Sequence, residues 1–442
     1  MGLSNDILPI TARRGSDGRL FVGGCDTVAL ARECGTPLYL YDQATMDAAV
    51  AGYRDALARH WPGRAEVAYA AKAWLSTALA QWAAARGLGM DVVSEGELRQ
   101  ALHAGFPPER LHAHGNNKPD GFLRACVGMG AGRVAIDHPR EAEQLAAICD
   151  SLGKRQGVWL RLNPATVADT HASIETGSAT SKFGLSLIEG DALRVARFVH
   201  NSPHLDWQGV HFHIGSQFTD TIALRQAIRR VFEWLARVRA ELGWIPAEFS
   251  PGGGWAVPYL PDEPYLAPDV AIPELVDAIV EGCDRLEMEL PTLVLEPGRE
   301  LVARAGVALY TVGTVKQAAS VRYAFLDGGL ADNPRPALYG ARYHTLLADR
   351  EGTGPQTCYS LAGPFCESGD TLVREITLPG LQEGDLLAVP VSGAYQLSMA
   401  SNYNGATRPA VLWLHEGRAQ VVQRRERIEE LWKRDCLIDL EP

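Results

Sequence analysis

Two patterns alternate along most of this 442-residue chain. Short apolar runs typical of buried strands are each followed by a stretch whose apolar residues recur with helical spacing. The apolar runs predict strands at 67–72, 90–94, 111–115, 133–137, 157–163, 209–215, 248–254 and 293–299. Helical spacing is found at 45–59, 75–86, 95–104, 139–152, 222–242 and 272–286. This alternation is typical of parallel strands joined by right-handed helical crossovers.

Eight such units over about 230 residues fit a TIM barrel, the (β/α)8 form of the α/β class. An open doubly wound sheet is the alternative, and periodicity does not decide between the two. The strand ends favour the barrel because a barrel gathers the carboxyl ends of its strands at one mouth. The residues at or just past these ends are Lys72, Ser94, Asn116, Asp137, Asn163, His213, Ser216, Gly252, Gly253, Gly254, Glu296 and Arg299.

The two ends of the chain have a different pattern. After residue 300, strand-like runs separated by Gly and Pro turns occur at 307–315, 323–327, 385–390, 410–414 and 419–424. Similar runs lie at 19–22 and 37–41, and helical spacing returns only at 426–433. We therefore predict a barrel in 45–300 and an all-β barrel or sandwich domain in 301–442, which N-terminal strands within 1–44 complete.

Composition narrows the class of the protein. Apolar residues make up 46% of the chain and charged residues 21%, as in globular domains, and the net charge of -11 argues against nucleic-acid or anionic-membrane binding. No apolar run reaches the length of a membrane span, and the N-terminus lacks the pattern of a signal peptide. The eight cysteines form no CxxC pair. We expect a reduced, cytoplasmic protein without a metal site.

Lys72 ends the first predicted barrel strand, and lysine is rarely buried without a partner. Either this strand end is open to water, or Lys72 is an amine that forms a Schiff base with a carbonyl group. The Gly252–Gly254 run and Arg299 follow strands seven and eight, where such barrels usually bind phosphate. A plain turn is the simpler interpretation of the glycines alone. Their position favours the phosphate site.

Two further strand ends fit a planar cofactor. Glu296 follows an apolar run, and it is either half of a surface pair with Arg299 or the partner of a ring nitrogen. His211 and His213 are either core residues or rings that stack on the cofactor. In the β region, the thiol of Cys366 lies next to Glu367 and near Asp370, which is unusual for a core segment. Lysine, phosphate cradle, carboxylate and imidazole together match the protein groups that pyridoxal phosphate chemistry needs.

These residues resemble the fold-type III, alanine-racemase-like family of pyridoxal phosphate enzymes and, within it, the diaminopimelate decarboxylases. The resemblance extends from about residue 37 to residue 404. It rests on motifs that occur in the family's order, among them Tyr69-Ala-Ala-Lys72, Gly115-Asn-Asn-Lys118, Ser181-Lys-Phe-Gly184, His213-Ile-Gly-Ser-Gln217, Glu296-Pro-Gly-Arg299, Arg335-Pro-Ala-Leu-Tyr339 and Cys366-Glu-Ser-Gly-Asp370. The chain departs from the family's pattern at the bulky residues Trp74, Trp255 and Phe365.

The resemblance implies a role for each motif. Lys72 would carry the pyridoxal 5'-phosphate, and Cys366 would return a proton to the substrate. The cofactor would further be bound by His213, Ser216, Gly254, Glu296, Pro297, Gly298, Arg299 and Tyr395, with Glu296 at the pyridine nitrogen. An amino-acid substrate would contact Arg299, Arg335, Tyr339, Glu367 and Tyr395. In this family Cys366 and Glu367 would reach into a partner's barrel, which implies a homodimer.

The implied reaction is the decarboxylation of meso-2,6-diaminopimelate to L-lysine and carbon dioxide, the last step of lysine biosynthesis. Arg335 favours a substrate with a distal carboxylate. The alternatives are a sister decarboxylase of ornithine, lysine, arginine or a D-amino acid, then an amino-acid racemase, and then a non-catalytic relative that binds the cofactor.

Overall fold

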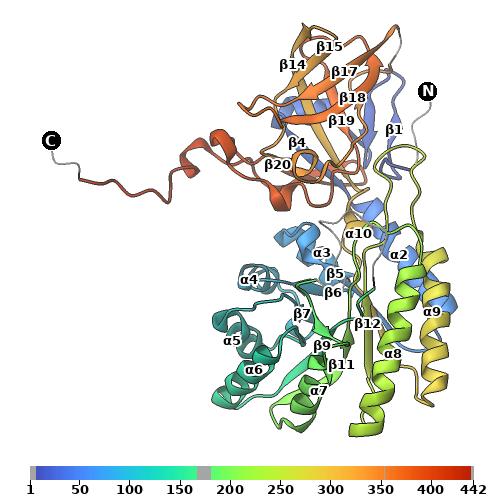
Figure 1. Ribbon diagram of the computed structural model, residues 1–442. Helices are drawn as coiled ribbons and strands as arrows, with labels where there is room; N and C mark the ends of the chain where they lie inside the picture. Colours follow the sequence, from blue (N-terminus) through green and yellow to red (C-terminus); the bar gives the residue numbers. More distant parts are fainter. Residues whose placement is uncertain (1–5, 167–180, 353, 440–442) are drawn as a thin grey trace. The chain divides into compact units, whose positions relative to one another are not determined.

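The computed structural model describes residues 6–166, 181–352 and 354–439. The chain forms two compact units (Figure 1). The barrel unit comprises Ala48–Val257 and Pro264–Leu301. The β unit comprises the chain up to Asp47, the segment Pro258–Glu263 and the chain from Val302 onwards. No helix in the described ranges is both long and apolar enough to cross a bilayer.

Eight parallel strands close into a barrel. They are β5 (Ala65–Ala70), β6 (Gly89–Val92), β7 (Leu111–Ala113), β8 (Arg133–Ile136), β9 (Gln156–Asn163), β11 (Leu205–His211), β12 (Glu248–Gly252) and β13 (Thr292–Leu295). The pairings of β13 with β5 and of β8 with β9 complete the ring, while β10 (Leu185–Ser186) adds to β9. The predicted TIM barrel is confirmed, and the open sheet is wrong.

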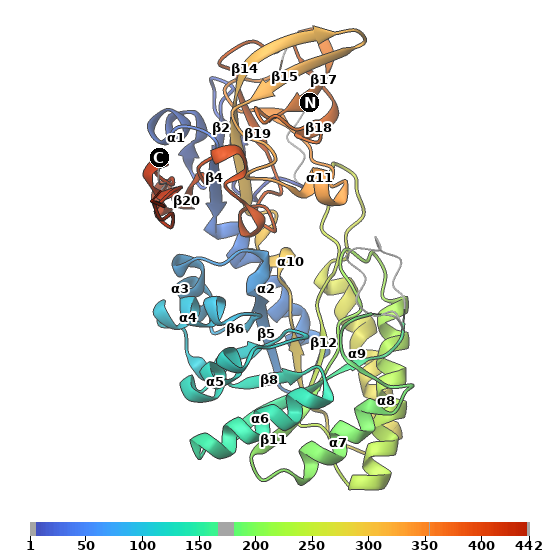
Figure 2. The same ribbon diagram turned by 60° about the vertical axis from the view of Figure 1, so that its left-hand side comes forward.

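The helices surround the barrel (Figure 2). They are α2 (Gln43–His60), α3 (Thr77–Ala85), α4 (Glu95–His103), α5 (Asp120–Met129), α6 (Pro139–Leu152), α7 (Asp191–Asn201), α8 (Ile222–Leu242) and α9 (Pro268–Arg285). Local signals set their ends. For example, the His138 side chain caps the start of α6, and Gly153 ends that helix with a φ of 61°. Helices α8 and α9 lie side by side.

Trp159 on β9 fills part of the barrel interior. It forms a fully buried cluster with Ala68, Ala135 and Val294, whose small side chains leave room for the indole. The indole Nε1 donates to Glu248 Oε2 at 2.6 Å. The barrel interior is therefore a packed core, and the chemistry is left to its carboxyl end.

The β unit is built on a nine-stranded sheet whose long strand is β14 (Gly306–Ala318). The main path runs β18 (Thr371–Pro379), β17 (Gln356–Ala362), β15 (Val321–Leu326), β14, β4 (Leu38–Asp42), β20 (Ala410–His415) and β21 (Arg418–Gln423). Strand β19 (Leu386–Val389) pairs with β14 and with β16 (Leu346–Leu347), and β1 (Arg13–Arg14), β2 (Leu20–Val22) and β3 (Cys25–Asp26) form a small separate sheet. The N-terminal strand β4 lies between β14 and β20, so it is part of this sheet.

Some predicted boundaries were wrong. The barrel strands end two to four residues before the predicted ends in most cases, so three predicted site residues lie past the strands. Lys72 is in a 3-10 turn, His213 is in a loop, and Arg299 begins the short helix α10 (Arg299–Val302). The predicted helix at 426–433 contains only a short 3-10 turn, Ile428–Glu430. Its apolar residues Ile428 and Trp432 are 56% and 53% exposed, so helical spacing there had no surface to pack on.

A buried carboxylate ties several parts of the β unit together. Asp332 Oδ2 accepts hydrogen bonds from Tyr39 Oη on β4 (2.9 Å) and Tyr310 Oη on β14 (2.5 Å), and its Oδ1 accepts from the Gly329 N–H (2.8 Å). Tyr39 Oη also lies 2.9 Å from Gln396 Oε1. Burial raises the pKa of Asp332 to about 6, although its hydrogen bonds with Tyr310, Gly329 and Tyr39 oppose this.

Replacing Asp332 with Asn should reveal this pKa shift. Because the pKa of Asp332 is higher in the folded state than in the unfolded chain, its contribution to stability is greatest below pH 4 and is lost as the pH rises through about 6. The unfolding free energy of the wild type relative to Asp332→Asn should therefore fall by about 2 kcal/mol between pH 4 and pH 7. Urea unfolding across this range measures the difference, and a constant difference would contradict the shift.

Candidate active site

Lys72 lies at the mouth of the barrel, in a 3-10 turn (Ala71–Ala73) that follows β5. Its side chain is exposed. Tyr69 fixes the turn, because its hydroxyl donates to the Trp74 carbonyl (2.6 Å) and accepts the Trp74 N–H (3.1 Å). Trp74 is 2% exposed, so this departure from the family's pattern packs into the interior beside the turn.

Glu296 lies directly after β13 and is 9% exposed. Two side chains donate to its carboxylate: Ser250 Oγ to Oε1 (2.7 Å) and His211 Nε2 to Oε2 (2.9 Å). Burial and the nearby Arg161 lower the pKa of His211 far below 6.5, so this imidazole is neutral at physiological pH. Glu296 is therefore a buried, oriented acceptor, and the surface-pair interpretation is wrong.

A second carboxylate, Asp91, lies in the same buried cluster. His112 Nδ1 is 3.2 Å from Asp91 Oδ1, and His114 Nε2 lies 3.7 Å from Asp91 Oδ1 and 3.9 Å from Glu296 Oε1. Burial and then Glu296 raise the pKa of Asp91, while Lys72 opposes the shift. Ionisation of both Asp91 and Glu296 at the same time is therefore unfavourable. One potential ligand atom each of His114, His211 and Glu296 lies within 4.8 Å of the other two, a spacing that would also suit a metal ion, although His211 Nε2 already bonds to Glu296 Oε2.

The loops after β11, β12 and β13 meet backbone to backbone. A Cβ atom on Gly253 would lie 2.2 Å from the Glu296 carbonyl oxygen, and one on Gly254 would lie 2.0 Å from the Gly215 carbonyl oxygen. Gly254 also has a φ of +107°, a conformation that other residues rarely adopt. The side chain of Gln217 joins two of these loops, because it both donates to and accepts from the Val257 backbone at 3.0 Å.

Three backbone N–H groups from these loops converge on one carboxylate, that of Glu300. The N–H groups of Gly254 (3.1 Å) and Trp255 (2.7 Å) donate to its Oε1, and the Gly298 N–H donates to its Oε2 (3.1 Å). Burial raises the pKa of Glu300, while its own backbone N–H, the neighbouring Arg299 and the N–H groups of Gly254 and Trp255 lower it. The three N–H groups thus surround a carboxylate, and the same arrangement would suit a phosphate.

These residues fit pyridoxal phosphate. Glu296 offers an oriented carboxylate, and the Gly254–Gly298 cradle already holds an anion. His213 follows β11, and burial followed by the Lys72 charge lowers its pKa, so its ring is neutral and suited to stacking. Ser216 lies in the loop after β11, and Arg299, the first residue of α10, is 6% exposed.

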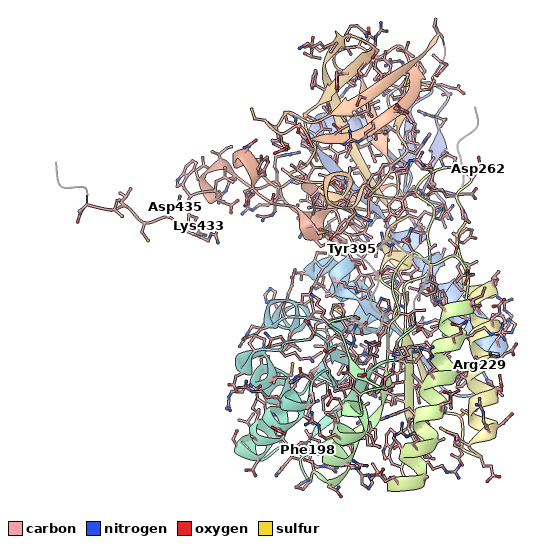
Figure 3. The ribbon with its side chains drawn as sticks, in the orientation of Figure 1. Phe198, Arg229, Asp262, Tyr395, Lys433 and Asp435 are labelled. Atoms are coloured by element: carbon pink, nitrogen blue, oxygen red, sulfur yellow. The ribbon has the colours of Figure 1, made fainter. Side chains whose placement is uncertain are left out.

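The β unit holds the predicted substrate residues Arg335 and Tyr395. Arg335, at the start of α11 (Arg335–Tyr339), is 7% exposed and donates to Tyr259 Oη (2.8 Å) and the Ala394 carbonyl (3.4 Å). Its guanidinium carbon lies 5.7 Å from the centre of the Tyr395 ring. Tyr395, labelled in Figure 3, has a φ of +61°, so its loop holds backbone strain of the kind found at ligand sites.

Cys366 and Glu367 lie on an exposed turn between β17 and β18. Asp370 holds the turn from inside, because its carboxylate accepts the N–H groups of Leu330 (2.7 Å) and Phe365 (2.9 Å). The backbone N–H of Cys366 donates to Asn404 Oδ1 (3.3 Å). The two side chains are therefore presented outward, and Phe365 packs against Tyr403.

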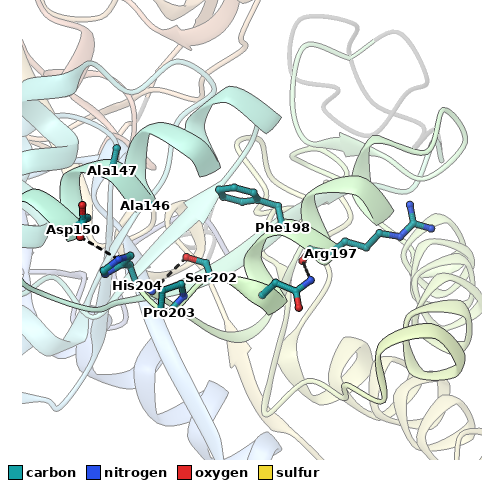
Figure 4. Close-up of a pocket in the computed structure, with 9 residues that line it drawn as sticks. Ala146, Ala147, Asp150, Arg197, Phe198, Ser202, Pro203 and His204 are labelled. Carbon is teal, nitrogen blue, oxygen red and sulfur yellow. Dashed lines mark hydrogen bonds and ion pairs between the residues drawn. The ribbon is translucent and has the colours of Figure 1, made fainter.

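A separate pocket of about 720 Å3 lies between α6 and α7 (Figure 4). His204 and Asp150, 3.3 Å apart, are among its lining residues. Because His204 directly precedes β11, the pocket lies at the end of the barrel opposite the strand carboxyl ends. It contains none of the predicted site residues.

Three features of the site had no clear signal in the sequence. Ser250 and His112 lie within predicted strands, and nothing local marks them as partners of a carboxylate. Glu300 directly follows a recognised motif, but the convergence of three N–H groups on it depends on how the loops fold. The structure thus adds to the predicted site a layer of residues that orient Glu296 and fill the cradle.

Comparisons with known proteins agree with this geometry. The sequence model of the family described as "Pyridoxal-dependent decarboxylase, pyridoxal binding domain" matches residues 44–303. The chain is 41% identical to a diaminopimelate decarboxylase of Bacillus subtilis over 426 residues, which are 96% of this chain and 97% of the relative. The predicted cofactor and the predicted enzyme class are confirmed by these matches.

Solved structures give the same result. The crystal structure of a diaminopimelate decarboxylase from M. jannaschii in complex with L-lysine superposes with a TM-score of 0.90 at 31% identity, covering 97% of this chain and 98% of that one. The enzyme from Helicobacter pylori, also in complex with L-lysine, gives a TM-score of 0.84 at 30% identity, with 92% and 98% covered. The roles of individual residues stay predictions.

Replacing Gly254 with Ala should destabilise the cradle. The new Cβ would collide with the Gly215 carbonyl, and the positive φ would strain the backbone, so the unfolding free energy should fall by about 3 kcal/mol. Gly128→Ala is the matched control, since no atom lies within 4 Å of a Cβ there and helix α5 favours alanine. Urea unfolding compares them, and equal stability of the two variants would contradict the tight loop contact.

Proposed function

Because the chain belongs to the diaminopimelate decarboxylase family of pyridoxal-dependent decarboxylases, we propose that it decarboxylates meso-2,6-diaminopimelate to L-lysine. The reaction would release carbon dioxide from one end of the substrate and leave the other end intact. Specificity must then come from the distal ammonium and carboxylate, which the product also carries. The L-lysine bound in related structures supports this assignment.

The buried guanidinium of Arg335 is the observation that carries the proposal. Arg335 is 7% exposed, and among the described residues its Nε has no hydrogen-bond partner. An uncompensated N–H group of a buried arginine is costly, and a carboxylate that bonds two guanidinium N–H groups would satisfy it. A distal carboxylate occurs in diaminopimelate and is lacking in ornithine, lysine and arginine. Tyr339 and Glu367 would complete this end, with Glu367 accepting from the distal ammonium.

Each residue of the barrel mouth has a task in this reaction. Lys72 Nζ would bind the cofactor and later release the product amine, and His213 would hold the cofactor ring flat. Glu296 would keep a proton on the ring nitrogen, since Ser250 and His211 already orient its carboxylate. Pyridoxal phosphate, when bound, supplies the electron sink for the broken Cα–carboxylate bond. Cys366 Sγ would then give a proton to Cα.

We also propose that the active form is a homodimer in which Cys366 and Glu367 enter the partner's barrel. The outward-facing turn that carries both residues supports this, since neither has a buried environment of its own. Asp370 holds the turn in shape from within the β unit. We further propose that the protein is cytoplasmic, as the sequence predicts, because its substrate is a free amino acid.

Carbon dioxide release by the purified protein with pyridoxal phosphate tests the function. We expect release from meso-diaminopimelate, and not from L-lysine, L-ornithine, L-arginine or their D-forms. Arg335→Met should raise the KM for meso-diaminopimelate about 100-fold, as expected for the loss of a charged hydrogen-bonded pair. Release from a different substrate, or an unchanged KM in Arg335→Met, would contradict the assignment of the distal carboxylate.

Mixing two inactive variants tests the shared site. Lys72→Ala should lose both activity and the visible absorbance of the lysine-bound cofactor, while Cys366→Ala should keep that absorbance and lose most activity. After unfolding and refolding together, mixed dimers contain one barrel with Lys72 that faces an intact Cys366. About a quarter of the wild-type activity should return, because half of the dimers are mixed and each has one complete site. No recovery in a mixture shown to form mixed dimers would rule out the crossing of Cys366.

A further inference from the structure

Glu300 is an anion built into the cradle that the cofactor's phosphate would use. Its carboxylate accepts N–H groups from two loops, those of Gly254 and Trp255 after β12 and that of Gly298 after β13. The distances of 2.7 to 3.1 Å are those of good hydrogen bonds. Arg299, which directly precedes Glu300, adds a positive charge that favours the ionised carboxylate. All the elements of an anion site therefore act on this one side chain.

The cradle is shaped for an anion rather than for Glu300 in particular. A Cβ on Gly254 would meet the Gly215 carbonyl oxygen at 2.0 Å, and one on Gly298 would meet the Ala70 Cβ at 3.0 Å. Glycine at these positions lets the backbone N–H groups approach a bound group closely. A glutamate whose carboxylate is in water needs no such set of converging N–H groups. The glutamate thus occupies a position whose geometry suits a more highly charged ligand.

Glu300 and a phosphate cannot use the same donors at once. Each N–H group makes one strong hydrogen bond, and a phosphate dianion within about 4 Å of a carboxylate is strongly repelled in a poorly hydrated site. Resting on the proposed function, we propose that Glu300 competes with the cofactor's phosphate for the N–H groups of Gly254 and Gly298. The side chain must rotate out of the cradle before the cofactor binds fully, so Glu300 weakens cofactor binding.

The opposite role would give the opposite result. If Glu300 only held the two loops in place beside a phosphate bound elsewhere, its removal would loosen the loops and weaken cofactor binding. The sign of the change in cofactor affinity therefore separates the two roles. Glu300→Gln is the suitable change because it keeps the side-chain size and one acceptor oxygen but removes the charge.

Titration of the apoprotein with pyridoxal phosphate measures the effect. Glu300→Gln should bind the cofactor about tenfold more tightly than the wild type, a change typical of the loss of one opposing interaction. Inorganic phosphate is an independent probe and should bind to the Glu300→Gln apoprotein measurably more tightly than to the wild type. The rise in melting temperature on addition of the cofactor should also be larger in this variant.

Glu263→Gln is a matched control, because the Glu263 carboxylate likewise accepts two backbone N–H groups, from Tyr259 (2.9 Å) and Leu260 (3.0 Å), but lies outside the cradle. Its affinity for the cofactor should equal that of the wild type. Equal or weaker binding of cofactor and phosphate by Glu300→Gln, or an equal gain in Glu263→Gln, would overturn the inference. A wild-type protein that binds no pyridoxal phosphate would instead overturn the proposed function.

Discussion

The contact between the backbones of three neighbouring loops is the constraint on which the rest of the barrel mouth depends. At Gly253 and Gly254 no side chain fits, because carbonyl oxygens of Glu296 and Gly215 lie where a Cβ would be. The loops can therefore approach until their N–H groups point at one place. The same contact fixes the backbone of Glu296, whose side chain turns inward to Ser250 and His211. The three N–H groups around Glu300 and the carboxylate of Glu296, the proposed partner of the ring nitrogen, are thus parts of one arrangement.

Much of the barrel could be predicted from the sequence because its signals are local. Buried parallel strands are covered on both faces, so they are nearly continuous apolar runs. Helix α6 begins with a capping histidine and a proline and ends at Gly153, and its predicted bounds, 139–152, agree with the structure. Most strand ends were placed two to four residues too late because the sequence of one strand does not show where its pairing with the neighbouring strands stops.

Contacts between distant parts of the chain could not be predicted. Tyr39 and Asp332 are 293 residues apart, and nothing local in either segment indicates that they bond. The same holds for Ser250 on β12 and Glu296 directly after the adjacent strand β13, which are 46 residues apart. Such distant partners decide how the Glu296 carboxylate is oriented, whereas the motif only supplies it. The sequence therefore points to candidate chemical groups, whereas the side chains that hold them become visible only in the structure.

Two glutamates four residues apart show how surroundings divide the work of one side-chain type. Glu296 is held by a hydroxyl and a neutral imidazole, and its remaining lone pairs can accept a proton-bearing ring nitrogen. Glu300 is held by backbone N–H groups that cannot move away, so only the carboxylate itself can leave. Fixed donors with a movable anion keep the cradle folded whether or not phosphate is present. The free energy of binding a phosphate there is then the difference between the binding of phosphate and the binding of the Glu300 carboxylate to the same N–H groups. This difference is smaller than the free energy that phosphate would gain from binding to N–H groups that no carboxylate occupies.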